Sequence, residues 1–206
     1  MSILYVQQAL KAAGFDPGAA DGKWGPKTQA ALAAALRMPV EAVGGAPLPS
    51  ITVPAVAAQP KAVRPIWEIV IHCTATPEGR DVSVDTIRGW HQKRGFTDIG
   101  YHYVVALDGT IQPGRPEANI GAHVMGHNAG TIGISYVGGV DAKMQPKDTR
   151  TPAQRDALMA ACRALIAKYP SIAKVSGHNA YDQGKACPSF LVEDDPLSDI
   201  PKEART

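Results

Sequence analysis

The sequence predicts an α+β (mixed α/β) protein: a small N-terminal helical bundle linked to a larger domain with a central mixed β-sheet flanked by helices. Three observations lead to this prediction. Apolar residues recur at helical spacing within residues 1–40, prolines crowd residues 41–65, and residues 66–206 mix Ile/Val-rich runs with helical patterns. We therefore expect a module, a linker and a larger domain, in that order.

Composition is typical of a globular protein that folds in a cytoplasm. Of 206 residues, 45% are hydrophobic and 19% are charged, and no apolar run approaches the roughly 18 residues of a membrane span. The net charge of +2, without a basic run interleaved with aromatics, argues against nucleic-acid binding.

The first residues lack the basic and apolar regions of a signal peptide. Three cysteines, an odd number, argue against a disulfide framework.

The N-terminal part predicts two helices around a glycine- and aspartate-rich turn. Val6, Leu10 and Ala13 fall at helical spacing before Gly14, and an alanine-rich stretch at residues 28–36 predicts the second helix. Forty residues are close to the lower limit for an independent core. We expect five residues to supply most of it: Val6, Leu10, Phe15, Trp24 and Leu32.

The middle part, residues 41–65, reads as a linker. It contains five prolines after a Gly-Gly pair and shows neither a helical nor an alternating period. Because proline at this density favours extended chain, we expect a semi-rigid spacer between the two flanking units.

The first half of the larger domain predicts a strand, a helix and a hairpin. The run 66-IWEIVIH-72 is typical of a buried strand, and Ser83 can cap a helix that continues to about Arg94. Residues 101–107 and 110–115 flank Asp108-Gly109, a strong signal for a two-residue hairpin turn.

The second half predicts two more strands separated by a helix. Residues 131–137 read as a strand, and Thr151, Pro152 and Gln154 mark a capped helix start, with an apolar face that ends near Tyr169. A last strand, 172-IAKVSG-177, runs directly into His178. We expect the chemistry to lie where these strands end.

Three potential metal ligands follow from this layout. His72 and His178 each come directly after a buried-strand pattern, and Cys187 lies nine residues after His178. A thiolate and two neutral imidazoles suit zinc, and three protein ligands leave the fourth tetrahedral position open for water, as in catalytic sites. On spacing alone, however, a histidine after a strand is more often a hydrogen-bonded structural residue, and a cysteine before proline is more often a buried small hydrophobe.

The N-terminal part carries a recognisable motif pair. It contains V-Q-x-x-L-x-x-x-G-F followed by D-G-x-W-G-P-x-T-x-x-A-L, within residues 3–37. This pattern resembles the peptidoglycan-binding module of bacterial and phage wall hydrolases. The alternative from the residues alone is a small helical spacer without a ligand.

The larger domain carries four collinear motifs within residues 66–192. They are 70-VIHCTAT-76, the stretch 85–116 with G-Y-H-Y, 121-GAHVMGHNAGTIGISYVGG-139 and 177-GHNAYDQGKACPSF-190. Together they resemble the phage-type zinc N-acetylmuramoyl-L-alanine amidases, to which animal peptidoglycan recognition proteins are related.

This resemblance implies a role for each matching residue. The zinc ligands fall on His72, His178 and Cys187, and Tyr101 and Lys185 match the catalytic tyrosine and lysine. His123 and Asn128 match a substrate-lining segment. From the residues alone, Tyr101 could equally be a core-facing strand residue. A cation such as Lys185 beside the metal can stabilise the oxyanion that forms when an amide carbonyl is attacked.

The resemblance implies an endolysin that uses zinc-activated water to cleave the amide between N-acetylmuramic acid and L-alanine in bacterial peptidoglycan. We expect a monomer that neither enters membranes nor binds nucleic acid, and that stays in the host cytoplasm until it is released to the periplasm and cell wall. The alternatives are a non-catalytic peptidoglycan recognition protein and a peptidase that cuts within the stem peptide. The presence of Tyr101, Lys185 and Cys187 argues against the recognition protein.

Overall fold

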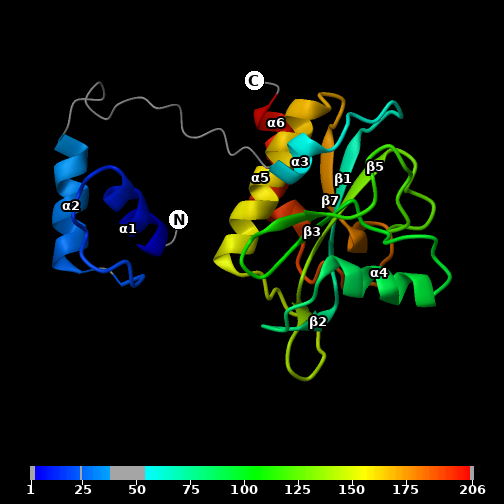
Figure 1. Ribbon diagram of the computed structural model, residues 1–206, viewed down its shortest axis with the longest axis horizontal. Helices are drawn as coiled ribbons and strands as arrows, with labels where there is room; N and C mark the ends of the chain where they lie inside the picture. Colours follow the sequence, from blue (N-terminus) through cyan, green and yellow to red (C-terminus); the bar gives the residue numbers. More distant parts are fainter. Residues whose placement is uncertain (1–2, 24, 38–53, 205–206) are drawn as a thin grey trace. The chain divides into compact units, whose positions relative to one another are not determined.

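The computed structural model describes residues 3–23, 25–37 and 54–204, and the chain divides into two compact units, Met1–Ser50 and Ile51–Thr206 (Figure 1). Within these described ranges, no helix has the length and apolar character needed to cross a membrane.

The first unit contains the two predicted helices. They are α1 (Ile3–Ala12) and α2 (Pro26–Arg37), and Gly14, with φ of +86°, follows the end of α1. Of the predicted core residues, Leu10 is buried, Trp24 lies outside the described residues, and the others are half-buried: Val6, Phe15 and Leu32. The helical prediction is therefore confirmed for this unit.

A buried polar residue, Gln7, organises the loop between these helices. Its side-chain amide donates to the Lys23 carbonyl (2.9 Å) and to Thr28 Oγ1 (3.1 Å), and its Oε1 accepts from the Gly22 amide (2.9 Å). These bonds satisfy the polar atoms of Gln7 inside a very small core. The glutamine of the V-Q motif thus has a structural task that its apolar neighbours cannot perform.

The second unit is built on a five-stranded mixed sheet with the order β4-β3-β5-β1-β7. The β4–β3 pair is antiparallel and the other neighbours are parallel. A separate two-stranded parallel ladder joins β2 (Thr76–Pro77) to β6 (Gly139–Val140). The five strands of the main sheet are β1 (Glu68–Cys73), β3 (Tyr103–Val105), β4 (Ile111–Pro113), β5 (Thr131–Tyr136) and β7 (Lys174–Gly177).

Helices cover both faces of this sheet, as the sequence predicted. Ile69, Ile71 and Ile134 pack with residues of α5 (Pro152–Lys168), whereas Val104 packs on the other face with Ile87 of α4 (Val84–Lys93). Because side chains alternate along a strand, residues that neighbour the isoleucines in sequence point toward the α4 side. Figure 1 shows α4 and α5 on opposite sides of the sheet.

The predicted caps and the hairpin are present. Ser83 accepts from the Thr86 amide at the start of α4, and Thr151 and Gln154 form a reciprocal capping box at the start of α5. The antiparallel strands β3 and β4 form the predicted hairpin, but residues 106–110 connect them, and Asp108 and Gly109 lie within this connection, which is longer than the predicted two-residue turn. Short helical segments complete the C-terminal part: η1 (His178–Ala180), η2 (Val192–Asp194), η3 (Pro196–Ser198) and α6 (Ile200–Glu203).

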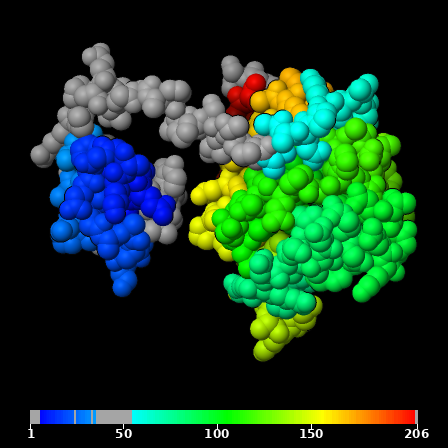
Figure 2. All heavy atoms as spheres, in the orientation of Figure 1, coloured from blue at the N-terminus to red at the C-terminus, as the bar shows by residue number. Residues whose placement is uncertain are grey.

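Residues 54–65, which the sequence assigned to the linker, differ from that prediction. They include a short helix, α3 (Pro54–Ala58), and both Val56 and Ala62 are buried in the core that α5 covers. Lys168 of α5 donates to the carbonyls of Val56 (3.0 Å) and Gln59 (2.6 Å). Figure 1 shows α3, in cyan, beside α5, in yellow, and Figure 2 shows cyan atoms on the same face of the molecule. Tertiary burial has therefore overridden the extended preference of a proline-rich sequence.

Candidate functional site

The strand register places His72 and His178 side by side. Ile71 of β1 pairs with Gly177 of β7 in a parallel ladder, so the next residue of each chain segment lies at the same edge of the sheet. The two imidazole rings have centroids 4.8 Å apart. β1 includes His72 and ends at Cys73, one residue later than the sequence predicted, whereas His178 directly follows β7 as expected.

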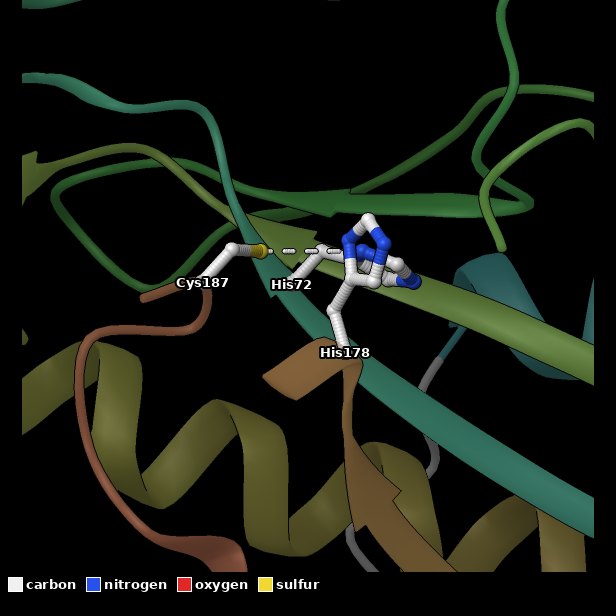
Figure 3. A group of neighbouring side chains, drawn as sticks. All are labelled: His72, His178 and Cys187. Atoms are coloured by element: carbon white, nitrogen blue, oxygen red, sulfur yellow. Dashed lines mark hydrogen bonds between the residues drawn. The ribbon is translucent and has the colours of Figure 1, made fainter. Parts of the chain in front are cut away.

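The segment after His178 folds back and brings Cys187 to the two histidines. The Asn179 amide donates to the Cys187 carbonyl (2.8 Å), which closes this loop at its base. Cys187 Sγ lies 3.7 Å from His72 Nδ1 and accepts from the Cys73 amide at 3.3 Å. Figure 3 shows the three side chains converging, and their ligand atoms all lie within 4.8 Å of one another.

This donor set fits a zinc ion. Zn–S and Zn–N bonds of about 2.3 and 2.0–2.1 Å at a tetrahedral angle require a sulfur–nitrogen separation of about 3.6 Å. The 3.7 Å between Cys187 Sγ and His72 Nδ1 is close to that value. His178 is the third donor of the cluster, which leaves one tetrahedral position for a non-protein ligand.

Both histidines are held in the neutral form that metal binding requires. Burial, followed by the neighbouring His123 and His178, lowers the pKa of His72 well below its ordinary value. Burial and then the charge of Lys185 lower the pKa of His178. Neither imidazole therefore has to lose a proton at neutral pH before it can bind a metal.

Tyr101 lies against His72 of this cluster, although it precedes β3 rather than belonging to it. Its ring stands between those of His72 and His91, with centroids at 5.1 and 5.2 Å. His91 Nδ1 accepts from the Gly100 amide (2.8 Å), which holds the chain next to Tyr101. Burial and the nearby Cys187 raise the pKa of Tyr101, so its hydroxyl stays protonated and can donate a hydrogen bond.

Lys185 lies on the exposed side of the loop that joins His178 to Cys187. Its amide donates to the Asp182 carbonyl (2.9 Å), which makes a turn two residues before Cys187. The positive charge of Lys185 contributes to lowering the pKa of His178, one of the three clustered donors. Tyr181 anchors the same loop, because its hydroxyl donates to Glu68 Oε1 (2.5 Å).

The structure places His123 inside the site and Asn128 in the turn that supports it. His123 is buried, and its Nδ1 lies 3.1 Å from Nε2 of His72. Asn128 Oδ1 accepts from the backbone amides of His123 and Val124, both at 2.9 Å. Their predicted substrate-lining role stays a prediction. The sequence spacing of His72 and His123 gives no indication that these two residues are in contact.

The Cys73 thiol lies on the α5 side of β1, opposite to the His72 side chain, and it interacts with the Cys187 thiol. It is buried with the core on the α5 side, and its Sγ lies 3.7 Å from Ser189 Oγ. Within the described part of the chain, the grouped metal donors are His72, His178 and Cys187.

The ends of the strands of this mixed sheet present two neutral histidines and one cysteine, a donor set of the kind that catalytic zinc sites of hydrolases use. The comparisons specify the class of hydrolase. Residues 62–190 match the N-acetylmuramoyl-L-alanine amidase family, and the chain belongs to this family. Residues 2–35 match the putative peptidoglycan binding domain.

Individual proteins agree with this assignment. The endolysin of Klebsiella phage KP32 is 41% identical over 123 residues, which cover 60% of this chain and 80% of that protein. The solved structure of the endolysin N-acetylmuramoyl-L-alanine amidase LysCS from Clostridium intestinale is 31% identical, with a TM-score of 0.56 over 69% of this chain and 86% of LysCS. Drosophila peptidoglycan recognition protein SD, at 21% identity and a TM-score of 0.56 over 68% of this chain and 87% of that protein, shares the fold.

Proposed function

We propose that this peptidoglycan hydrolase is a zinc-dependent endolysin that cleaves the amide between N-acetylmuramic acid and L-alanine. The observation that carries the proposal is the convergence of His72, His178 and Cys187 in a chain of the amidase family. Their chemistry and spacing suit zinc and leave one coordination position open. Zinc bound there would polarise the scissile carbonyl and lower the pKa of a water toward about 7.

The chain's own residues supply the remaining steps. Tyr101 keeps its phenolic proton and lies against His72, so it can hydrogen-bond to the attacking water or to the carbonyl oxygen. Lys185 brings a positive charge to the rim of the site, where it stabilises the oxyanion of the tetrahedral intermediate. The segment from His178 to Cys187 therefore supplies two metal ligands and the cationic side chain of Lys185.

The N-terminal unit adds affinity for the polymer. Its match to a putative peptidoglycan binding domain supports a wall-binding role, with bacterial peptidoglycan as the partner of both units. Tethering a binding unit to a hydrolase raises the effective concentration of substrate at the active site without any new contact there. The site of action is the bacterial cell wall.

A non-catalytic recognition protein is the second candidate, because the chain shares its fold with peptidoglycan recognition protein SD. A complete His-His-Cys donor set beside Tyr101 and Lys185 favours the hydrolase, since binding the polymer requires no metal donors.

Removing the thiol of Cys187 tests the proposed zinc site. Cys187→Ala should lower zinc content from one ion per chain to near zero and abolish lysis of purified cell walls. Cys162→Ala is the matched control, because Cys162 is buried in the core on α5, away from the cluster, and should retain both properties. Full zinc content in Cys187→Ala would contradict the assigned ligand set.

A further inference from the structure

A chain of hydrogen bonds runs from Thr131 through His123 to Nε2 of His72, whose other ring nitrogen, Nδ1, lies beside Cys187. Thr131 Oγ1 lies 3.0 Å from the His127 carbonyl and 3.2 Å from the Asn128 carbonyl. Carbonyl oxygens only accept, so the single hydroxyl proton of Thr131 is directed to them. The lone pairs of Oγ1 are then left for the ring of His123, whose Nε2 lies 3.3 Å away.

The next two protons follow from this first assignment. His123 Nε2 must carry the proton that it donates to Thr131, so in a neutral ring its Nδ1 is a bare acceptor. The group facing that acceptor is Nε2 of His72, at 3.1 Å. His72 Nε2 is therefore protonated, and its Nδ1, on the side of Cys187 Sγ at 3.7 Å, carries a free lone pair.

The ring of His123 is packed closely against two glycines as well as being held through its nitrogens. A Cβ atom added to Gly121 would lie 2.4 Å from Cδ2 of His123, and one added to Gly133 would lie 2.6 Å from the same atom. These two glycines thus allow the backbone to approach the imidazole closely, and any larger residue at either position would displace the ring. Asn128 holds the adjoining backbone through the amides of His123 and Val124.

We propose that His123 is a positioning residue: the Thr131–His123–His72 chain fixes the tautomer of His72 with a proton on Nε2 and presents Nδ1 to the metal. This inference rests on the proposed zinc function and gives His123 a different task from the substrate-lining role that the sequence suggested. A second group that orients a ligating histidine commonly raises metal affinity by 10–100-fold.

Nuclear magnetic resonance of the metal-free full chain tests the proton positions directly. In protein labelled with ¹⁵N-histidine, long-range ¹H–¹⁵N correlations distinguish the two neutral tautomers. We expect His72 with its proton on Nε2 and a bare Nδ1. A His72 ring with its proton on Nδ1 would overturn the proposal, whatever the activity of the enzyme.

Zinc affinity, measured by competition with a chromophoric chelator, tests the consequence. His123→Leu removes the acceptor and should weaken binding 10–100-fold. His123→Asn keeps an acceptor near the position of Nδ1 and should restore most of the affinity. Cobalt-substituted protein should show an altered visible spectrum for His123→Leu and a wild-type-like spectrum for His123→Asn. Equal zinc affinity and equal cobalt spectra in wild type and His123→Leu would overturn the inference.

Thr131→Val tests the same hydrogen-bond chain if His123→Leu does not fold. Valine has nearly the shape of threonine and suits a strand, but it removes the acceptor for His123 Nε2. We expect severalfold weaker zinc binding with a normal melting temperature, and unchanged affinity would count against the chain. Absence of zinc binding in the wild-type protein would instead refute the proposed function itself, which separates the two failures.

Discussion

A buried ion pair between Glu117 and Lys168 contacts residues 54–65, and the first prediction concerns the loss of this pair. Glu117 is fully buried, and Lys168 Nζ lies 2.8 Å from its Oε2. The hydroxyls of Tyr103 and Tyr169 also donate to this carboxylate. Lys168→Met would remove the cation while keeping an aliphatic side chain of similar length.

The expected loss in the free energy of unfolding follows from the Glu117 carboxylate, which stays buried after the substitution. Removing one partner of a buried ion pair costs about 3–5 kcal/mol, because the other charge stays without compensation. Two tyrosine hydroxyls still donate to Glu117, so we expect the lower end, about 3 kcal/mol. For a protein of this size that loss corresponds to a fall in melting temperature of roughly 6–12 °C. The carbonyls of Val56 and Gln59 lose their donor at the same time.

Guanidinium unfolding of the full chain, followed by tryptophan fluorescence, measures the loss. Hydrogen exchange should also show faster exchange in residues 54–65. Lys147→Met is the matched control: Lys147 forms a half-exposed pair with Glu78 (2.6 Å), and such pairs contribute about 0–1 kcal/mol. Adding Glu117→Gln to Lys168→Met should recover part of the stability. A loss below about 1 kcal/mol for Lys168→Met would refute the reasoning.

Three further predictions concern the module, the catalytic pair and acid stability. Deleting residues 1–40 should weaken binding to cell walls and spare turnover of a soluble muropeptide; loss of that turnover would show a structural role for the module. Tyr101→Phe and Lys185→Met should each lower kcat about 10²-fold or more while zinc content stays at one per chain, and loss of zinc would contradict these roles. Burial raises the pKa of Asp148, but the hydrogen bonds and charge of Arg150 lower it by more, so the net shift is downward. The ionised Asp148 therefore stabilises the fold fully above the unfolded pKa of about 3.9, and this contribution decreases as the pH falls below that value. Asp148→Asn should make the acid unfolding curve flatter, and an unchanged curve would contradict that assignment.

The fold could be predicted where local signals and burial agree. The isoleucine-rich run that became β1 and the capping box at Thr151 each specify one structure, and the structure confirms both. Residues 54–65 could not be predicted, because proline content favours an extended linker when it is read locally. Lys168 and Glu117, which hydrogen-bond to this segment, are more than 50 residues away from it in sequence.

The site could be predicted in part. The strand-end positions and the motifs pointed to His72, His178 and Cys187, and the structure brings these three together. Sequence spacing gave no indication that His123 contacts His72, since the contact depends on how the turn after Gly121 folds over β5. Ring packing against glycines and the direction of hydrogen bonds become visible only in three dimensions.

The central claim is metal-dependent cleavage of one particular amide bond, and mass spectrometry of fragments released from purified peptidoglycan tests it most directly. The digestion would be run with the full chain, with a zinc chelator, and with zinc added back after the chelator. We predict free stem peptides that begin at L-alanine, released by the untreated and the zinc-restored protein and missing in the chelated sample. Intact polymer that still binds the protein, or fragments cut elsewhere in the peptide, would contradict the account.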